Sequence, residues 1–415
     1  MDNTLSEICK RAKTVKYDIE KLTTEQKDKA LLRAAQLLLQ RKNEIITANG
    51  TDLENGRKKG MHEGLLDRLL LNEKRIEAMA EGLRQVADLP DPIGIISEER
   101  TVPSGLSLKK ISVPMGVIGI IYESRPNVTA DAFSLCFKAG SAVILKGGSD
   151  AINSNRCIVN ILKDSLTDCD IDPDAVQLIE STDREVTKEF MTMKEYVDLL
   201  IPRGGAGLIR SVVENSLIPV IETGTGNCHI FVDESADQKR AVEVILNAKT
   251  QRIGVCNAME SLVVHEAIVD EFMPVLAQAL REKNVEIRAD ETVSKIIDCN
   301  IATEEDYATE YLDLILSVKT VSNIDEAISH INRYTTHHSE AILTSDMKNA
   351  EKFQREIDAS CVYVNASTRF TDGFEFGLGA EIGISTQKLH ARGPMGLKEI
   401  TSYKYLINGD YTVRK

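Results

Sequence analysis

The segment Val117-Ile-Gly-Ile-Ile-Tyr-Glu-Ser-Arg-Pro-Asn-Val128 begins with a continuous apolar run, 117–121, that is suited to a buried strand. A second apolar run, Ala142–Leu145, follows a helix-like stretch, Asp131–Lys138, that ends at Gly140. Further short apolar runs alternate with helical segments at 176–179, 196–201, 218–221 and 230–232. Strands that are buried on both faces and joined by helices are typical of a parallel, doubly wound sheet. The sequence therefore predicts an α/β fold.

Three glycine-bearing turns follow predicted strands, at Lys146–Ser149, Pro202–Gly207 and Glu222–Gly226. In doubly wound sheets, ligands bind at the carboxyl ends of the strands. Glycine lets a backbone approach a phosphate, and a helix N-terminus favours anionic groups. None of the turns has the Gly-x-Gly-x-x-Gly spacing of the dinucleotide fingerprint, so each alone also fits an ordinary turn. Together they favour a dinucleotide site.

A cysteine in a polar setting lies further along, in Asn247-Ala-Lys-Thr-Gln-Arg-Ile-Gly-Val-Cys-Asn-Ala-Met-Glu-Ser261. Cys256 is expected on a turn between a helix and a strand, with Lys249 and Arg252 nearby. Positive charge favours the thiolate, which is the nucleophilic form of cysteine. The alternative is a buried structural cysteine, a common environment for this residue. The pattern leaves both interpretations open.

The remaining segments give scaffold predictions. Thr23 to Asn49 has helical periodicity, and a second helical region runs from Gly64 to Leu89. A hairpin is expected over Arg100–Val113, with its turn at 103–105. After Cys256, a second α/β segment has apolar strands at 261–265, 312–318, 341–344 and 361–364. The doublet His337-His338 is expected to be solvated in a polar loop, and the histidines show no metal-ligand spacing, so no metal site is predicted.

Composition limits the classes of function. The chain has 415 residues, of which 42% are hydrophobic, so a large soluble core is possible. Its net charge of −14 argues against non-specific binding to nucleic acid or anionic membranes. No run approaches the ~20 apolar residues of a membrane span, and the polar start predicts no signal peptide. The eight cysteines form no Cys-x-x-Cys pair, which favours a reducing, cytoplasmic compartment.

Four motifs carry a family resemblance that spans most of the chain. They are the Cys256 loop and the runs 122–129, 146–149 and 379–388. In this order they resemble the γ-glutamyl phosphate reductases of the aldehyde dehydrogenase superfamily. The resemblance implies two doubly wound α/β domains and a small β oligomerisation element. The implied organisation is an NADP-binding domain of residues 1–98 and 114–233, a catalytic domain of residues 234–384, and an oligomerisation hairpin and tail of residues 99–113 and 385–415.

The resemblance also assigns cofactor contacts. A lysine after a strand meets the adenosine ribose, a glycine turn before a helix faces the pyrophosphate, and a later glutamate binds the nicotinamide ribose. The matching residues are Lys146, Gly147, Ser149, Gly204, Gly205, Gly224 and Glu310. The turn here reads Gly204-Gly-Ala206 in place of the usual Gly-Ser-Thr, and the surroundings of Glu310 depart from the family pattern. NADPH is the implied cofactor.

The implied reaction is reduction of L-glutamyl 5-phosphate to L-glutamate 5-semialdehyde and phosphate, the second step of proline synthesis from glutamate. Cys256 would form the thioester, and Asn127 is a candidate donor to its oxyanion. The anionic substrate calls for cations, for which Arg125, Arg252 and Lys388 are the candidates. Glu222 occupies the place of the general base of hydrolytic relatives, so a phosphate-independent aldehyde dehydrogenase for another acid semialdehyde is the alternative. A homo-oligomer and coupling to glutamate 5-kinase are the implied partners.

Overall fold

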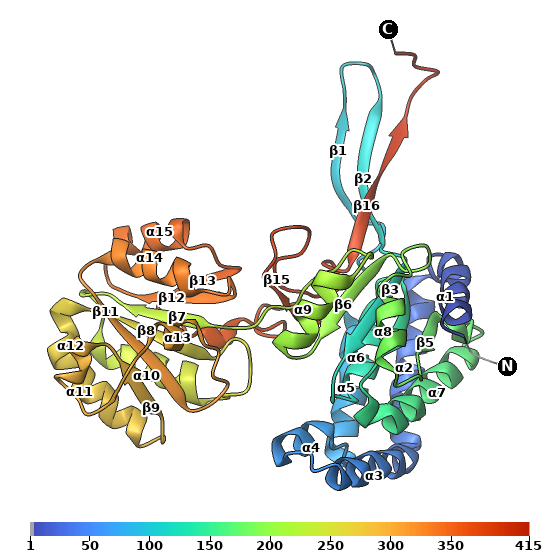
Figure 1. The fold of residues 1–415 in the computed structure, drawn as a ribbon. Coiled ribbons are helices and arrows are strands. Elements are labelled where there is room, and N and C mark those ends of the chain that lie inside the picture. The colour runs from blue at the N-terminus through green and yellow to red at the C-terminus, as the bar shows by residue number, and fades with distance from the viewer. Residues whose placement is uncertain (1–3, 415) are drawn as a thin grey trace. The chain divides into compact units, whose positions relative to one another are not determined.

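The computed structural model describes residues 4–414 and divides them into two compact units. Unit 1 comprises residues up to 222 together with 377–383 and 395 onward. Unit 2 comprises Thr223–Phe376 and Ile384–Pro394. Each unit has its own parallel sheet and its own hydrophobic core (Figure 1). The predicted α/β class and its parallel sheets are therefore confirmed.

The sheet of unit 1 has four parallel strands in the order β5-β4-β3-β6. The strands are β3 (Val117–Tyr122), β4 (Ala142–Lys146), β5 (Val176–Leu178) and β6 (Leu199–Arg203). Every residue of β3, β4 and β5 is buried, which explains their unbroken apolar runs. Gly119 in β3 allows close packing, because a Cβ atom at this position would lie 2.4 Å from Leu200 Cδ2. The expected strand at 218–221 forms only an isolated bridge, between Val220 and Leu200.

Helices cover the sheet of unit 1 and build its N-terminal part (Figure 1). They are α1 (Leu5–Ile19), α2 (Thr24–Gln40), α3 (Lys42–Lys58), α4 (Glu63–Leu69), α5 (Glu73–Asp88), α6 (Val128–Lys138), α7 (Ile152–Thr167), α8 (Arg184–Phe190) and α9 (Ala206–Asn215), with short 3-10 turns at Ser149–Ala151 and Pro173–Ala175. Thr23 and Gln26 form the expected capping box of α2. The single helix expected over 23–49 is interrupted at Arg41, where α2 ends and α3 begins.

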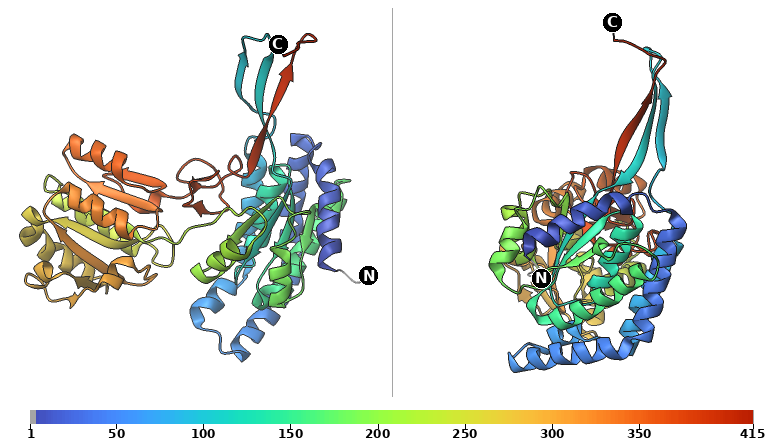
Figure 2. Two further views of the ribbon diagram at one scale, coloured as in Figure 1. Left: turned by 45° about the horizontal axis from the view of Figure 1, so that its top comes forward. Right: turned by 90° about the vertical axis from the view of Figure 1, so that its right-hand side faces the viewer.

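Three antiparallel strands form an arm that projects from unit 1 (Figures 1 and 2). They are β1 (Ile96–Thr101), β2 (Ser107–Pro114) and β16 (Thr401–Asn408), with β2 in the centre. The predicted hairpin is present, and Gly105 at its turn has a φ of 87°, a conformation that favours glycine. The C-terminal tail pairs with β2 along the whole of β16. All of β1 and most of β16 are exposed.

The sheet of unit 2 has seven parallel strands in the order β10-β9-β11-β8-β7-β12-β13. They are β7 (Cys228–Val232), β8 (Met259–His265), β9 (Glu286–Ala289), β10 (Asn300–Ile301), β11 (Ile315–Val321), β12 (Ser339–Leu343) and β13 (Cys361–Val364). A separate two-stranded pair joins β14 (Ile384–Ser385) to β15 (Gly393–Pro394).

Helices pack on both faces of this larger sheet, as Figure 1 shows. One face carries α10 (Gln238–Thr250), α11 (Glu266–Arg281) and α12 (Glu291–Ser294). The other face carries α14 (Ile324–Tyr334) and α15 (Met347–Glu356). Two short helices, α13 (Glu304–Ala308) and the 3-10 helix η3 (Thr368–Phe370), complete the unit. Each face has its own buried cluster, so unit 2 is doubly wound.

The boundary between the units differs from the predicted one. The prediction placed the strand at 230–232 in the first domain, which ended at residue 233. In the structure, β7 pairs with β8 and β12 and belongs to unit 2. Residues 377–383, predicted in the catalytic domain, belong to unit 1. The pairing of β7 with β8 and β12 decides to which unit it belongs. The apolar sequence of β7 alone does not indicate which strands it pairs with.

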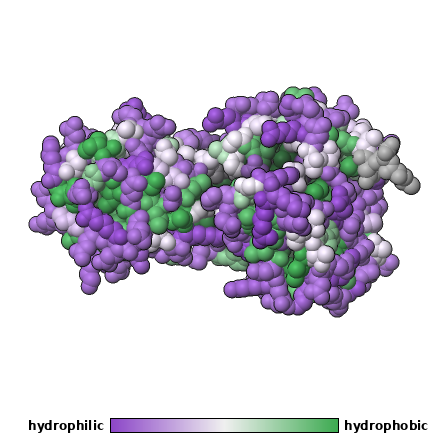
Figure 3. Space-filling model, turned by 60° about the horizontal axis from the view of Figure 1, so that its bottom comes forward, coloured by the Kyte–Doolittle hydropathy of each residue, from purple (hydrophilic) through white to green (hydrophobic). Residues whose placement is uncertain are grey.

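The surfaces of both units are largely polar. On the face drawn in Figure 3, hydrophilic residues cover most of each unit, with smaller apolar areas between them. Among residues 4–414, no helix combines the length and the apolar character needed to cross a membrane. All eight cysteines lie in this part of the chain, and all are free thiols.

Candidate active site

Cys256 lies between α10 and β8, three residues before Met259, the first residue of β8. Three other site residues precede strands of the same sheet: Gly226 before β7, Glu310 before β11 and His338 before β12. Parallel strands begin at a common edge of their sheet, so these residues meet at the amino-terminal edge of unit 2. The candidate nucleophile is half-buried there.

His338 is the residue that contacts the thiol. Its Nε2 lies 3.1 Å from Cys256 Sγ, and the imidazole is fully buried. Burial lowers the pKa of His338 to about 4, so the ring is neutral near pH 7. The expectation of a solvated histidine doublet is wrong for His338 and right for His337, which is exposed. A neutral imidazole beside a thiol is the arrangement of a base that activates a nucleophile.

The other nitrogen of this imidazole contacts the hydroxyl of Ser339, and the thiol of Cys228 lies 3.8 Å from it. His338 Nδ1 lies 2.8 Å from Ser339 Oγ, which lies 2.6 Å from Thr371 Oγ1. Thr371 Oγ1 lies in turn 2.7 Å from the hydroxyl of Tyr363. When Nδ1 donates its proton to Ser339, the lone pair of Nε2 faces Cys256. The buried hydroxyl chain can therefore hold the tautomer in which His338 accepts the thiol proton.

The turn before β7 packs closely against the backbone of Cys256. A Cβ atom on Gly226 would lie 1.4 Å from the carbonyl oxygen of Cys256, which no side chain tolerates. A Cβ atom on Gly224 would lie 2.2 Å from Thr386 Cγ2. The same carbonyl oxygen of Cys256 accepts a hydrogen bond from Cys228 Sγ at 3.2 Å. Glycine at 226 is thus required for the position of the nucleophile loop.

Glu310 accepts a hydrogen bond from the backbone N–H of Gly226 at 2.7 Å. Burial raises the pKa of this carboxyl. The residue that the family resemblance links to the nicotinamide ribose therefore lies beside the turn that supports Cys256. Glu310 is half-buried and is therefore not a fully solvated surface carboxylate.

A buried ion pair links the two elements that flank the nucleophile loop. Lys249 Nζ lies 2.5 Å from Glu260 Oε2, and both side chains are fully buried. Lys249 lies in α10, before the loop, and Glu260 lies in β8, after it. Burial raises the pKa of Glu260, although Lys249 opposes the shift. Glu260 Oε1 also accepts from the backbone N–H of Leu312 at 3.1 Å, which links the loop to the segment of Glu310.

The predicted cations of unit 2 have different surroundings. Arg252 is exposed on the nucleophile loop, four residues before Cys256. Lys388 Nζ lies 2.7 Å from Asp358 Oδ2, and Arg392 binds the other oxygen of the same carboxylate at 2.7 Å. These two partners lower the pKa of Asp358 to about 2. Lys388 is therefore part of a surface ion-pair cluster, whereas Arg252 adjoins the thiol loop.

The predicted cofactor residues of unit 1 lie at the carboxyl ends of β4 and β6. Lys146 is buried at the end of β4, where its Nζ donates to the carbonyl oxygen of Gly147 at 3.1 Å. Desolvation lowers the pKa of this lysine. Gly147 is closely packed, since a Cβ atom would lie 2.2 Å from Asn155 Nδ2, a buried amide nitrogen without a hydrogen-bond partner among the described residues. Ser149 begins the following 3-10 turn.

A carboxylate lies at the glycine turn before α9. Glu123, the first residue after β3, accepts from the backbone N–H of Gly205 at 2.9 Å. A Cβ atom on Gly204 would lie 2.5 Å from the same carboxylate oxygen. The turn before this helix therefore binds an anion, which in this structure is the protein's own Glu123 side chain, and its predicted contact with a cofactor stays a prediction.

The remaining predicted residues of unit 1 lie after β3 and at the end of the unit. Asn127 donates from Nδ2 to Asp131 Oδ2 at 3.0 Å, within the first turn of α6. Desolvation raises the pKa of Asp131 to about 6. Arg125 is exposed in the same connection, and Glu222 is the last residue of unit 1 before the chain enters unit 2. The roles proposed for these three residues stay predictions.

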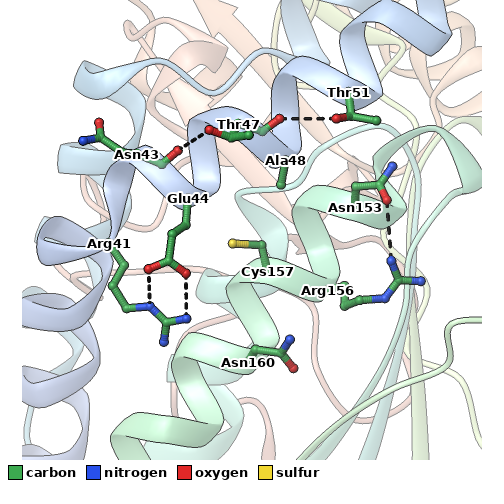
Figure 4. Close-up of a pocket in the computed structure, with 10 residues that line it drawn as sticks. All are labelled: Arg41, Asn43, Glu44, Thr47, Ala48, Thr51, Asn153, Arg156, Cys157 and Asn160. Atoms are coloured by element: carbon green, nitrogen blue, oxygen red, sulfur yellow. Dashed lines mark hydrogen bonds and ion pairs between the residues drawn. The ribbon is translucent and has the colours of Figure 1, made fainter.

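A surface groove of about 650 Å³ lies between α3 and α7 in unit 1 (Figure 4). It contains none of the predicted site residues. Its arginines are neutralised by neighbours: Arg41 binds Glu44 through two nitrogens, and Arg156 binds Glu180 at 2.8 Å. Cys157 faces this groove, and burial raises the pKa of its thiol, which makes it less reactive than an ordinary cysteine.

Comparison with known proteins gives one consistent result. A family model described as the aldehyde dehydrogenase family matches residues 2–297 and 301–406. A γ-glutamyl phosphate reductase from Clostridium botulinum (strain Eklund 17B / Type B) is 57% identical over 97% of this chain and 98% of its own length. The crystal structure of a γ-glutamyl phosphate reductase from Thermotoga maritima has a TM-score of 0.98 at 51% identity, and covers 99% of this chain and 100% of its own. A propionaldehyde dehydrogenase from Rhodopseudomonas palustris, at 15% identity over 97% of this chain and 96% of its own, shares the fold with a TM-score of 0.69.

Proposed function

Because the chain belongs to the aldehyde dehydrogenase family and, within it, to the γ-glutamyl phosphate reductases, we propose that it reduces L-glutamyl 5-phosphate to L-glutamate 5-semialdehyde with release of phosphate. This is the second step of proline synthesis from glutamate. The observation that carries the proposal is the 3.1 Å contact between Cys256 Sγ and His338 Nε2. It gives the chain a nucleophile with an adjacent base, which acyl transfer requires.

In the proposed route, Cys256 attacks the acyl carbon of the substrate while His338 accepts the thiol proton at Nε2. Formation of the new C–S bond gives a tetrahedral adduct, which collapses to the thioester as the C–O bond to phosphate breaks, and the leaving phosphate takes up the proton from His338. The backbone N–H of Cys256 is a natural donor to the oxyanion of the tetrahedral adduct. After reduction of the thioester, the C–S bond breaks, its electron pair returns to sulfur, and a proton restores the thiol.

NADPH is the proposed cofactor, and when bound it supplies the hydride that reduces the thioester. The residues of unit 1 fit a dinucleotide at the ends of β3, β4 and β6. The buried Lys146 supplies a cation, and the closely packed Gly147 and Gly204 leave backbone exposed where side chains would not fit. Gly224 and Glu310, which the family resemblance also assigns to the cofactor, belong to unit 2, and their role as contacts is part of the proposal. Glu123 already holds the N–H of Gly205, so phosphate binding at this terminus requires that contact to change.

The test measures NADP⁺ reduction with L-glutamate 5-semialdehyde, with and without inorganic phosphate, for the wild type and Cys256→Ala. We expect phosphate-dependent turnover that the variant lacks. Turnover without phosphate would favour the hydrolytic alternative, in which Glu222 acts as the base, and absence of turnover in both conditions would refute the proposed substrate. NAD⁺ in place of NADP⁺ tests the cofactor preference.

The arm suits a role in assembly, and we propose that the protein is a homo-oligomer. Its outer strands β1 and β16 expose backbone edges and the apolar side chains of Ile96, Tyr403 and Ile407. Exposed edges of this kind invite pairing with another chain. Coupling to glutamate 5-kinase is also proposed. The kinase would produce the acyl phosphate, which is reactive, and direct transfer to this enzyme would limit its loss by hydrolysis. Removal of residues 401–414 is expected to lower the mass in sedimentation.

A further inference from the structure

The side chain of Arg369 forms hydrogen bonds with residues on both sides of Cys256 in its loop. Its Nε donates to Gln251 Oε1 at 2.8 Å, and its Nη1 donates to Asn257 Oδ1. Asn257 follows the nucleophile directly and is itself held by the carbonyl oxygen of Thr371, to which its Nδ2 donates at 2.8 Å. The guanidinium of Arg369 is therefore fixed beside Cys256.

A second arginine shares this position. Arg252 follows Gln251, the hydrogen-bond partner of Arg369, and is exposed. Burial lowers the pKa of Arg369, the positive charge of Arg252 lowers it further, and Asp372, Cys256 and Cys228 oppose the shift. Like charges in a partly desolvated setting repel each other unless an anion lies between them.

The acidic groups near these arginines form no direct ion pair with them among the described residues. Among residues 4–414, no ion pair involves either arginine. Asp372 is close enough to raise the pKa of Arg369, but its Oδ1 accepts from the backbone N–H of Phe374 at 2.9 Å and of Glu375 at 3.4 Å. In a chain of net charge −14, two adjacent arginines without a carboxylate partner are a notable local excess of positive charge.

We propose that Arg369 and Arg252 bind an anionic group of the substrate, a phosphate or a carboxylate, next to Cys256. Arg369 offers a guanidinium in a fixed orientation, and Arg252 adds a second positive charge from the solvent side. The identity of the anion as part of L-glutamyl 5-phosphate rests on the proposed function. The anion site itself rests only on the contacts and charges of unit 2. If Arg369 served only to hold η3 against the loop, the site would have no preference for anions.

The first experiment measures this preference without turnover. Cys256 is alkylated with iodoacetate, which is anionic, and with iodoacetamide, which is neutral, and the modified Cys256 peptide is quantified by mass spectrometry. We expect Arg369→Gln and Arg252→Gln each to lower the ratio of iodoacetate to iodoacetamide rates about tenfold, because a nearby cation concentrates the anionic reagent. Arg369→Lys should retain most of the ratio. Arg355→Gln, an exposed arginine paired with Glu356, is the matched control and should leave the ratio unchanged.

The anion site would be overturned if the rates of alkylation by iodoacetate and iodoacetamide changed equally, or if their ratio were unchanged in both Arg369→Gln and Arg252→Gln. The second experiment measures KM in the oxidative direction for inorganic phosphate and for the semialdehyde. A rise of about tenfold in one of them, with kcat less affected, supports the proposal and identifies the anion as phosphate or carboxylate. Unchanged values of both would overturn it. If the wild type does not oxidise the semialdehyde but the alkylation ratio responds as expected, the anion site stands and only the proposed substrate fails.

Discussion

His338 Nε2 and Cys256 Sγ are 3.1 Å apart, although the two residues are separated by 82 positions in the sequence. The imidazole is fully buried, while the adjacent His337 is exposed and holds the carbonyl oxygen of Asp358 at 2.6 Å. The two adjacent histidines thus have different environments, and His337 can serve as a matched control for substitutions of His338.

His338→Gln is expected to lower kcat/KM by about 10²- to 10⁴-fold, the usual contribution of a general base. The alkylation of Cys256 by iodoacetamide near pH 7 should slow as well, because less thiolate forms. His337→Gln should leave both rates near the wild-type values. Alkylation of Cys256 at the wild-type rate in His338→Gln would show that the imidazole does not activate the thiol.

The stability of the protein should depend on pH through the same residue. Burial lowers the pKa of His338 from an ordinary value of 6.5 to about 4, so between these values the unfolded chain binds a proton that the folded chain does not. The stability gained from neutral His338 is therefore present above pH 6.5 and lost as the pH falls toward 4. Urea midpoints of the wild type and His338→Gln, measured over this range, should converge on acidification. A constant difference between them would contradict the prediction.

The ion pair at the base of the nucleophile loop should be costly to break. Lys249→Met leaves the buried carboxylate of Glu260 unpaired and is expected to destabilise unit 2 by about 3–5 kcal/mol. The double variant Lys249→Met/Glu260→Gln should recover part of this loss. The exposed pair Lys58–Glu54 is the control, and Lys58→Met should change stability far less than Lys249→Met does. Urea denaturation followed by circular dichroism measures all three, and a single variant that is no less stable than the double variant would argue against the pair.

Gly226→Ala should displace the nucleophile. A Cβ atom at this position would overlap the carbonyl oxygen of Cys256, so the loop has to move, and even a shift of ~1 Å can cost about a hundredfold in rate. The control is Gly50→Ala in α3, where no atom lies within 4 Å of the added methyl group and where alanine favours the helix. Steady-state kinetics and the alkylation rate of Cys256 test the comparison. Normal values of both in Gly226→Ala would mean that the loop adapts without loss.

Glu123→Gln should strengthen the binding of NADP⁺. The carboxylate of Glu123 lies at the N-terminus of α9, where the pyrophosphate is proposed to bind, and removal of its charge relieves repulsion. We expect the Kd to fall by a few fold in a fluorescence titration, with little change in Glu180→Gln, whose carboxylate pairs with Arg156 on the surface. Weaker binding in Glu123→Gln would indicate that this carboxylate contacts the cofactor favourably.

Much of the architecture could be predicted from local pattern. The buried runs 117–121 and 142–145 became β3 and β4 because strands covered on both faces must be apolar throughout. The capping box at Thr23 and the turn at Gly105 were also local signals, and both are present. Cys256 was identifiable because its loop combines glycine, polar residues and nearby cations within a few positions.

The rest depended on contacts between distant segments. His338 and Arg369 reach the Cys256 loop only after β12 and β13 have taken their places in the sheet, and neither has a local motif. The rule that ligands bind at carboxyl ends of strands selected two turns of unit 1 and the turn that contains Gly226. It did not select Cys256, which lies at the amino-terminal edge of the sheet of unit 2. Lys388 was selected by charge alone, and the carboxylate of Asp358 was not visible in its neighbourhood of the sequence.

The division of the chain also has a practical consequence for protein engineering. The chain passes from one unit to the other between residues 222 and 223, 376 and 377, 383 and 384, and 394 and 395. A protease that cuts at one of these passages releases neither unit, because the other passages still link them covalently. Expression of unit 2 alone likewise requires a short designed linker that joins residue 376 to residue 384. A simple truncation at residue 222 would leave the arm without β16, and therefore with β2 exposed along an unpaired edge.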